Sequence, residues 1–169
     1  MRPAAEYWRK KLELDTHIEG GSYRRTYASG IHIPQHDLPA GFHGSRPSAT
    51  AIYFLLEKDQ FSALHRIASD EGWHFYYGDP LIVYEIDTEG QLTEHLLGNH
   101  PENNESFQCV VKAGHWFGAR LKPGGEYALV GCTVSPGFDF ADFELATRAP
   151  LLLQYPQHEG LILSLTRDK

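Results

Sequence analysis

The stretch 61–80, FSALHRIASDEGWHFYYGDP, indicates the fold most clearly. Apolar side chains dominate 61–67 and again 72–77, and the polar group Ser69-Asp70-Glu71-Gly72 lies between them. Each apolar run has the length of a short strand, and the residues between them favour a turn. The stretch therefore predicts two consecutive strands joined by a turn.

Runs of the same kind extend the pattern on both sides and are separated by Gly-, Pro-, Asp- and Asn-containing turns. The strands that we expect are 50–56, 61–67, 72–77, 81–86, 92–97, 107–111, 116–121 and 127–134, with a further one at 22–27. Many short strands at this spacing, without helices between them, are typical of a sandwich or barrel. They exclude an alternating βαβ fold.

The two ends of the chain follow a helical pattern. Residues 4–14 predict a short amphipathic helix, and residues 147–166 predict a helical tail that Pro156 ends or divides. Between the first expected strands, residues 30–47 form a long polar connection. Such a segment is either a functional flap or a loop that packs on a partner.

Length, charge and cysteine content set the broad class. The 169 residues fit one domain, 1–169, with the barrel over about 21–146. A net charge of −7 argues against binding to a nucleic acid polymer. Cys109 and Cys132 lie in apolar runs and are expected to be free thiols. No apolar stretch is long enough for a signal peptide or a membrane span, so we expect a cytoplasmic protein.

The stretch 61–80 resembles the first sequence motif of the cupins, in which a His-x-His pair is followed by a Glu and a Gly. His65, Glu71 and Gly78 fall on the first His, the Glu and the Gly, whereas Ile67 replaces the second His. The stretch 110–121 resembles the second motif, with Phe117 in place of its His.

Leu121 stands where the second motif usually has Asn. Of the usual metal ligands only His65 and Glu71 remain, which leaves a divalent ion under-coordinated. We therefore expect no metal and no cofactor. His74 lies three residues after Glu71, so a shared strand would place the two side chains on opposite faces.

Over nearly its whole length the chain is similar to the fifth cupin family. The matching stretches are 20–27, 50–56, 65–80, 113–120, 129–140 and 155–167. The resemblance implies an all-β fold of cupin type, a double-stranded β-helix or jelly-roll barrel, usually in a homodimer. The family is related in fold to sugar-nucleotide epimerases and plant storage proteins, and the resemblance leaves the activity open.

The candidate catalytic residues are His65, as a general base, and Glu71, which could orient it. The alternatives are a buried histidine with a satisfied partner and a turn carboxylate in solvent. The candidate ligand-binding residues are Trp73, Phe75, Phe117, Ala119 and Arg24. Trp73 and Phe75 could equally be plain core, and Arg24 and Arg25 could belong to a solvated strand face.

Two functions remain open at this point. The first is a metal-free protein that binds a small molecule inside the barrel, such as a nucleotide or sugar nucleotide. The second is an isomerase or epimerase that acts on a similar polar ligand with His65 as general base. The partners that we expect are a second copy of the chain and that ligand, with no membrane.

Overall fold

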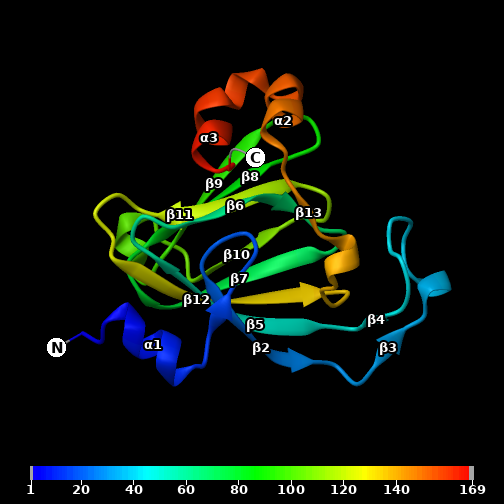
Figure 1. The fold of residues 1–169 in the computed structure, drawn as a ribbon, viewed down its shortest axis with the longest axis horizontal. Helices are drawn as coiled ribbons and strands as arrows, with labels where there is room; N and C mark the ends of the chain where they lie inside the picture. The colour runs from blue at the N-terminus through cyan, green and yellow to red at the C-terminus, as the bar shows by residue number, and fades with distance from the viewer. Residues whose placement is uncertain (1, 168–169) are drawn as a thin grey trace.

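Two antiparallel sheets face each other, and helices cover part of the outer side of each (Figure 1). The computed structural model describes residues 2–167. The first sheet has the order β1 (Asp15–Thr16), β2 (Ser22–Ala28), β5 (Thr50–Glu57), β12 (Tyr127–Ser135), β7 (Asp70–Gly78), β10 (Gln108–Val111). The second has the order β13 (Glu144–Leu145), β6 (Phe61–Arg66), β11 (Trp116–Leu121), β8 (Leu81–Ile86), β9 (Leu92–Leu97).

The main core lies between the two sheets and explains the alternation in the sequence. Val130 on β12 pairs with Phe54 on β5 and with Phe75 on β7, and all three side chains are buried in this core. Intervening residues point outward, because successive side chains of a strand lie on opposite faces. Trp73 and Phe117, from opposite sheets, meet in the core with ring centroids 6.4 Å apart.

The two ends of the chain cover the outer faces of the barrel. Helix α1 (Ala5–Lys11) is shorter than the expected 4–14, and Trp8 packs with Leu55 outside the six-stranded sheet. The tail forms α2 (Arg148–Gln154), a 3₁₀ turn η4 (Pro156–His158) and α3 (Glu159–Ser164) over the five-stranded sheet (Figure 1). Pro156 begins the turn that divides the tail, as predicted.

The polar connection 30–47 forms a small two-stranded hairpin that extends away from the barrel (Figure 1). Its strands are β3 (His32–Ile33) and β4 (Arg46–Pro47), with a 3₁₀ turn η1 (Gln35–Asp37) between them. Two further 3₁₀ turns are η2 (Pro101–Asn103) and η3 (Phe140–Asp142). Arg46 forms a two-pronged ion pair with Asp142, at 2.6 Å for each contact, which fastens the hairpin to η3.

The turn predicted between the strands 61–67 and 72–77 is wrong for Asp70 and Glu71. Asp70 to Gly72 belong to β7, where Glu71 pairs with Val134 on one side and Val111 on the other. Pairing with two neighbouring strands outweighs the turn preference of these residues. This shift places Glu71 on a central strand, with its side chain between the sheets.

The expected all-β jelly-roll barrel with an N-terminal helix and a C-terminal helical tail is confirmed. Cys109 and Cys132 are both free, the first half-buried and the second buried. Within residues 2–167, none of the helices combines the length and the apolar character that crossing a membrane requires.

Candidate functional site

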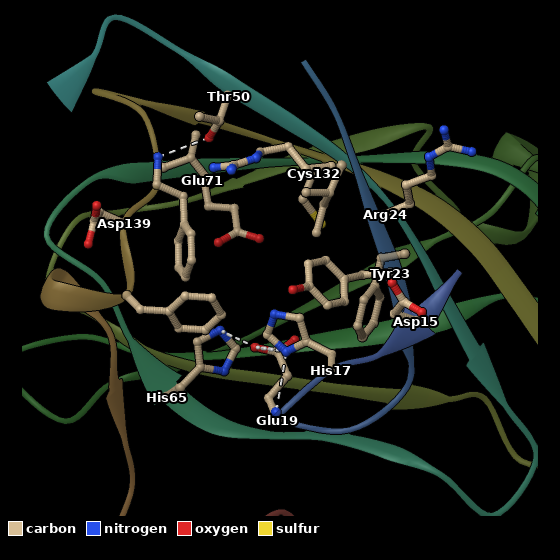
Figure 2. A pocket seen from close by; sticks show the side chains of 16 residues that line it. Asp15, His17, Glu19, Tyr23, Arg24, Thr50, His65, Glu71, Cys132 and Asp139 are labelled. Carbon is tan, nitrogen blue, oxygen red and sulfur yellow. Dashed lines mark hydrogen bonds and ion pairs between the residues drawn. The ribbon is translucent and has the colours of Figure 1, made fainter. Parts of the chain in front are cut away.

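A cavity of about 410 Å³ opens between the two sheets. Its walls come from β1, β2, β5, β6, β7 and β12, from the loop between β1 and β2, and from residues 138–140. Figure 2 shows Glu71 on one side of this space and His17, Glu19 and His65 together on the other. The lining therefore combines these titratable side chains with apolar rings.

His65 lies on β6, and both of its ring nitrogens have protein partners. Nδ1 is 2.7 Å from the carbonyl oxygen of Ala63, and Nε2 is 3.1 Å from Oε2 of Glu19. A carbonyl oxygen can only accept a hydrogen bond, so Nδ1 carries the proton. In the neutral ring Nε2 is then an acceptor, and burial lowers the pKa of His65 to about 4, which keeps the ring neutral at pH 7.

The carboxyl of Glu19 carries the proton of the hydrogen bond between Glu19 and His65. Burial raises the pKa of the Glu19 carboxyl. Oε1 accepts a hydrogen bond of 2.8 Å from the Ser62 hydroxyl, which leaves Oε2 to donate to Nε2 of His65. The pair is thus a neutral acid hydrogen-bonded to a neutral imidazole.

The loop between β1 and β2 places Glu19 through two glycines. Gly20 and Gly21 have φ of +116° and +74°, a region that side chains with a Cβ rarely adopt. A Cβ on Gly20 would lie 2.1 Å from the carbonyl oxygen of Phe61. The loop is held on β6 by a bond from Ala63 N–H to the Glu19 carbonyl oxygen, 2.9 Å. Arg167 donates to the same oxygen at 2.8 Å.

His17 precedes Glu19 in the same loop and presents its other ring nitrogen to the cavity. The backbone N–H of Glu19 donates to Nδ1 of His17 at 3.3 Å, and burial lowers the pKa of this imidazole. The neutral ring therefore carries its proton on Nε2. Nδ1 is also 3.6 Å from Oε2 of Glu19, which is too long for a hydrogen bond.

Glu71 points into the cavity from β7 and is 7% exposed. Burial raises the pKa of Glu71 to about 8. The thiol of Cys132 on the neighbouring strand donates to it, and burial raises the pKa of that thiol well above its usual value. At pH 7 the Glu71 carboxyl is thus mainly protonated and has an O–H to donate.

The structure brings together three of the seven residues selected from the sequence. His65, Glu71 and Arg24 all line the cavity, and Arg24 lies at its rim, where it pairs with Glu13. The other four lie in the core between the sheets and are absent from the cavity lining: Trp73, Phe75, Phe117 and Ala119. The ring of Phe117 contacts that of His65 at 4.1 Å between centroids.

Sequence reasoning missed His17, Glu19 and Tyr23, which also line the cavity. Glu19 lies more than forty residues before His65, so local spacing could not connect them. The one clue in the sequence is the pair Gly20-Gly21, which marks a sharp turn directly after an acidic residue.

The donor set does not fit the metal that cupin motifs commonly hold. Both nitrogens of His65 are engaged within the protein, and the ring of Phe117 covers one face of the imidazole. His74 lies on the outer face of β7, with Nε2 3.2 Å from the Thr133 hydroxyl. His115 bonds to Glu85 at 2.7 Å. In residues 2–167 no group of three or more His, Cys, Asp or Glu side chains could bind a metal ion.

A closed double sheet with a polar cavity between its layers defines a cupin-type barrel protein. The sequence profile described as "Cupin superfamily (DUF985)" matches residues 6–146, and the chain belongs to this family.

Two solved structures resemble the chain over nearly its whole length. A protein from Shewanella oneidensis is 40% identical, with a TM-score of 0.88 over 99% of this chain and 100% of the other. A hypothetical protein from Leishmania major is 35% identical, with a TM-score of 0.89 over 98% and 100%.

A more distant structure, oxalate decarboxylase from Bacillus subtilis, shares the fold alone. It is 15% identical, with a TM-score of 0.54 over 92% of this chain and 38% of the other. No curated protein matches the chain.

Proposed function

We propose that this protein binds a small polar molecule in the cavity between its sheets. The observation that carries the proposal is Glu71, a buried carboxyl that points into an accessible cavity and has no cationic partner among residues 2–167. Burying an ionisable group without a structural partner costs stability, and such groups gather at functional sites. A volume of about 410 Å³ also falls within the range of small-molecule sites, roughly 300–1,000 Å³.

The test is a screen of nucleotides, sugars, sugar nucleotides and organic acids by thermal unfolding. A ligand at a hundred times its Kd should stabilise the protein by about 2.7 kcal/mol. Glu71→Leu should lose the shift, whereas Glu144→Gln, outside the cavity on an exposed ion pair, should keep it. A shift that survives in Glu71→Leu would place binding elsewhere.

A second candidate function is an isomerase or epimerase, because an acid faces an acid–imidazole pair across the cavity (Figure 2). His65 cannot be the direct base, since neither nitrogen is free. Glu19 would instead take a proton from a carbon next to a carbonyl on the second lone pair of Oε1, and pass its own proton from Oε2 to Nε2 of His65. Glu71 would return a proton to the substrate from the other side.

The readout for this second function is deuterium incorporation from solvent into any ligand that the screen identifies. Exchange at a carbon, lost in His65→Gln without loss of binding, would establish proton transfer. A ligand that binds and is released without exchange would leave the protein a binding protein only.

A further inference from the structure

Three polar groups in the cavity interior, apart from the charged side chains of the rim, are hydrogen-bond donors. They are the Glu71 carboxyl, Nε2–H of His17 and the hydroxyl of Tyr23, and Figure 2 shows these side chains directed into one space. In the described residues Nε2 of His17 and the Tyr23 hydroxyl have no hydrogen-bond partner. The tautomer of His17 is fixed by the Glu19 backbone N–H, so its free nitrogen donates.

The strongest acceptors of the cavity are already occupied. Oε1 of Glu19 accepts from Ser62, and its other oxygen and Nε2 of His65 bond to each other. The cavity interior therefore offers hydrogen atoms and carries little negative charge of its own while Glu71 is protonated. A ligand group that complements such a wall is an acceptor.

The rim carries charged side chains of both signs close to these donors. Arg25 lines the cavity from β2, opposite Ile52 in register, and has no ion-pair partner in residues 2–167. Arg24 is neutralised by Glu13, and two carboxylates, Asp15 and Asp139, also lie at the rim. Asp139 accepts a hydrogen bond from the Ala141 N–H, which holds its carboxylate against its own loop.

The remaining walls are aromatic, which favours a flat ligand body. The rings of Phe54, Phe138 and Phe140 line the cavity, and His17 stacks on Phe140 with centroids 6.2 Å apart. Ring faces of this kind pack against planar, largely apolar groups. The wall thus combines aromatic rings with hydrogen-bond donors around one space.

We infer that the cavity takes a small planar organic acid, whose carboxylate accepts hydrogen bonds from Glu71, Tyr23 and His17 while its ring packs among the phenylalanines. This inference rests on the proposed binding function and specifies the ligand class. A protonated carboxyl can donate to a carboxylate without repelling it, and such charge-assisted bonds are strong.

The pH dependence of binding follows from the groups that face Glu71. They are Cys132 from β12, Cys109 from β10, Glu19 and His17 from the β1–β2 loop, His65 from β6, Tyr23, Arg24 and Arg25 from β2, Asp15 from β1, and Asp139. Glu71 itself changes charge near pH 8 and is directed at the ligand. A carboxylate ligand should therefore bind below pH 8, weaken above it, and take up a proton on binding near pH 8.

The experiment compares three probes of one shape and different charge: benzoate, benzamide and benzylamine, titrated calorimetrically at pH 6.5 and pH 9. We expect benzoate to bind about tenfold tighter than benzylamine at pH 6.5, and to lose that advantage at pH 9. Heats measured at pH 8 in two buffers of different ionisation enthalpy should show proton uptake.

Two matched substitutions locate the effect. Glu71→Gln keeps a donor without a titrating group, so benzoate binding should persist and become independent of pH. Tyr23→Phe should weaken benzoate about tenfold, whereas Tyr27→Phe, an exposed residue of the same strand, should not.

Tighter binding of benzylamine, with proton release, would overturn the assignment in favour of a cationic ligand. Failure of all three probes while other molecules of the screen bind would also overturn it and leave the proposed function standing. Failure of the whole screen together with these probes would reject both.

Discussion

Within the part of the chain that the structure describes, Glu71 is buried and has no charged partner, two properties that rarely occur together. Its carboxyl is protonated in the folded protein up to a pKa of about 8, compared with 4.5 for the ordinary side chain. The folded state therefore holds more protons than the unfolded chain between these two values. Unfolding free energy must fall as pH rises through this window, since the proton has to be released in a buried site.

Glu71→Gln should remove this dependence. At pH 9 we expect the variant to be more stable than the wild type, by up to roughly 5 kcal/mol at 1.36 kcal/mol per pKa unit, and nearly equal to it at pH 4. Urea unfolding at both pH values measures the difference. Equal stabilities at pH 9 would mean that Glu71 ionises without cost.

A second residue-level expectation concerns metal. Because His65 has no free nitrogen and Phe117 lies against its ring, protein prepared without a polyhistidine tag should contain no stoichiometric transition metal by elemental analysis. A metal that is present in the wild type and disappears in His65→Ala would contradict this.

Motif spacing could predict that His65 and Glu71 lie close to a cavity, because barrel strands repeat at a regular interval. It could not predict what each nitrogen of His65 contacts, since its partner Glu19 comes from a loop far away in sequence. The aromatic residues Trp73 and Phe117 were predicted to bind the ligand but lie in the core, away from the cavity lining. Strand parity assigns them to the inside of the barrel, but only the packing of both sheets decides whether they reach the cavity.

At the scale of elements, the β1–β2 loop determines the position of Glu19. Gly20→Ala should cost at least about 2 kcal/mol of stability, because the new Cβ meets the Phe61 carbonyl oxygen in a left-handed backbone region. Gly30→Ala is the matched control, since a Cβ there meets nothing within 4 Å. Thermal melts of both variants, with ligand binding as a second readout, test the loop. Equal losses of stability in the two variants would show that Gly20 is no more constrained than Gly30.

The hairpin at 30–47 depends on one buried ion pair. Arg46 and Asp142 are 3% and 5% exposed at their side chains, so Asp142→Asn would leave the guanidinium buried without its counter-charge. We expect a loss of about 3 kcal/mol in urea unfolding. Glu144→Gln, which breaks the exposed pair with Arg66, should change stability by less than about 1 kcal/mol. A small effect of Asp142→Asn would mean that the hairpin is held by other contacts.

Strand β2 has a long stretch of edge that no other strand within residues 2–167 covers. Strand β1 pairs only with Ser22 and Tyr23, so the edge from Arg24 to Ala28 is exposed on that side. Free edges of this kind are suited to pairing with a second strand. We propose that two copies of the chain associate along this edge.

Sedimentation equilibrium at micromolar protein should accordingly give about twice the mass of one chain. Backbone amides of residues 24–28 should exchange more slowly with solvent at high protein concentration than at low concentration. A monomer mass, or exchange that does not change with concentration, would contradict the homodimer.

The edge of the five-stranded sheet along β6, unlike the edge of β2, is covered by other segments of the chain. Its outer side receives β13 for two residues, the Leu165 carbonyl at the Leu64 N–H, and the Glu19 carbonyl at the Ala63 N–H. These contacts cover an apolar strand that would otherwise be open to aggregation. The β1–β2 loop, which positions Glu19, therefore also covers part of that strand edge. Changes that loosen it should make the protein lose ligand and precipitate together, so that solubility and binding decline as one property.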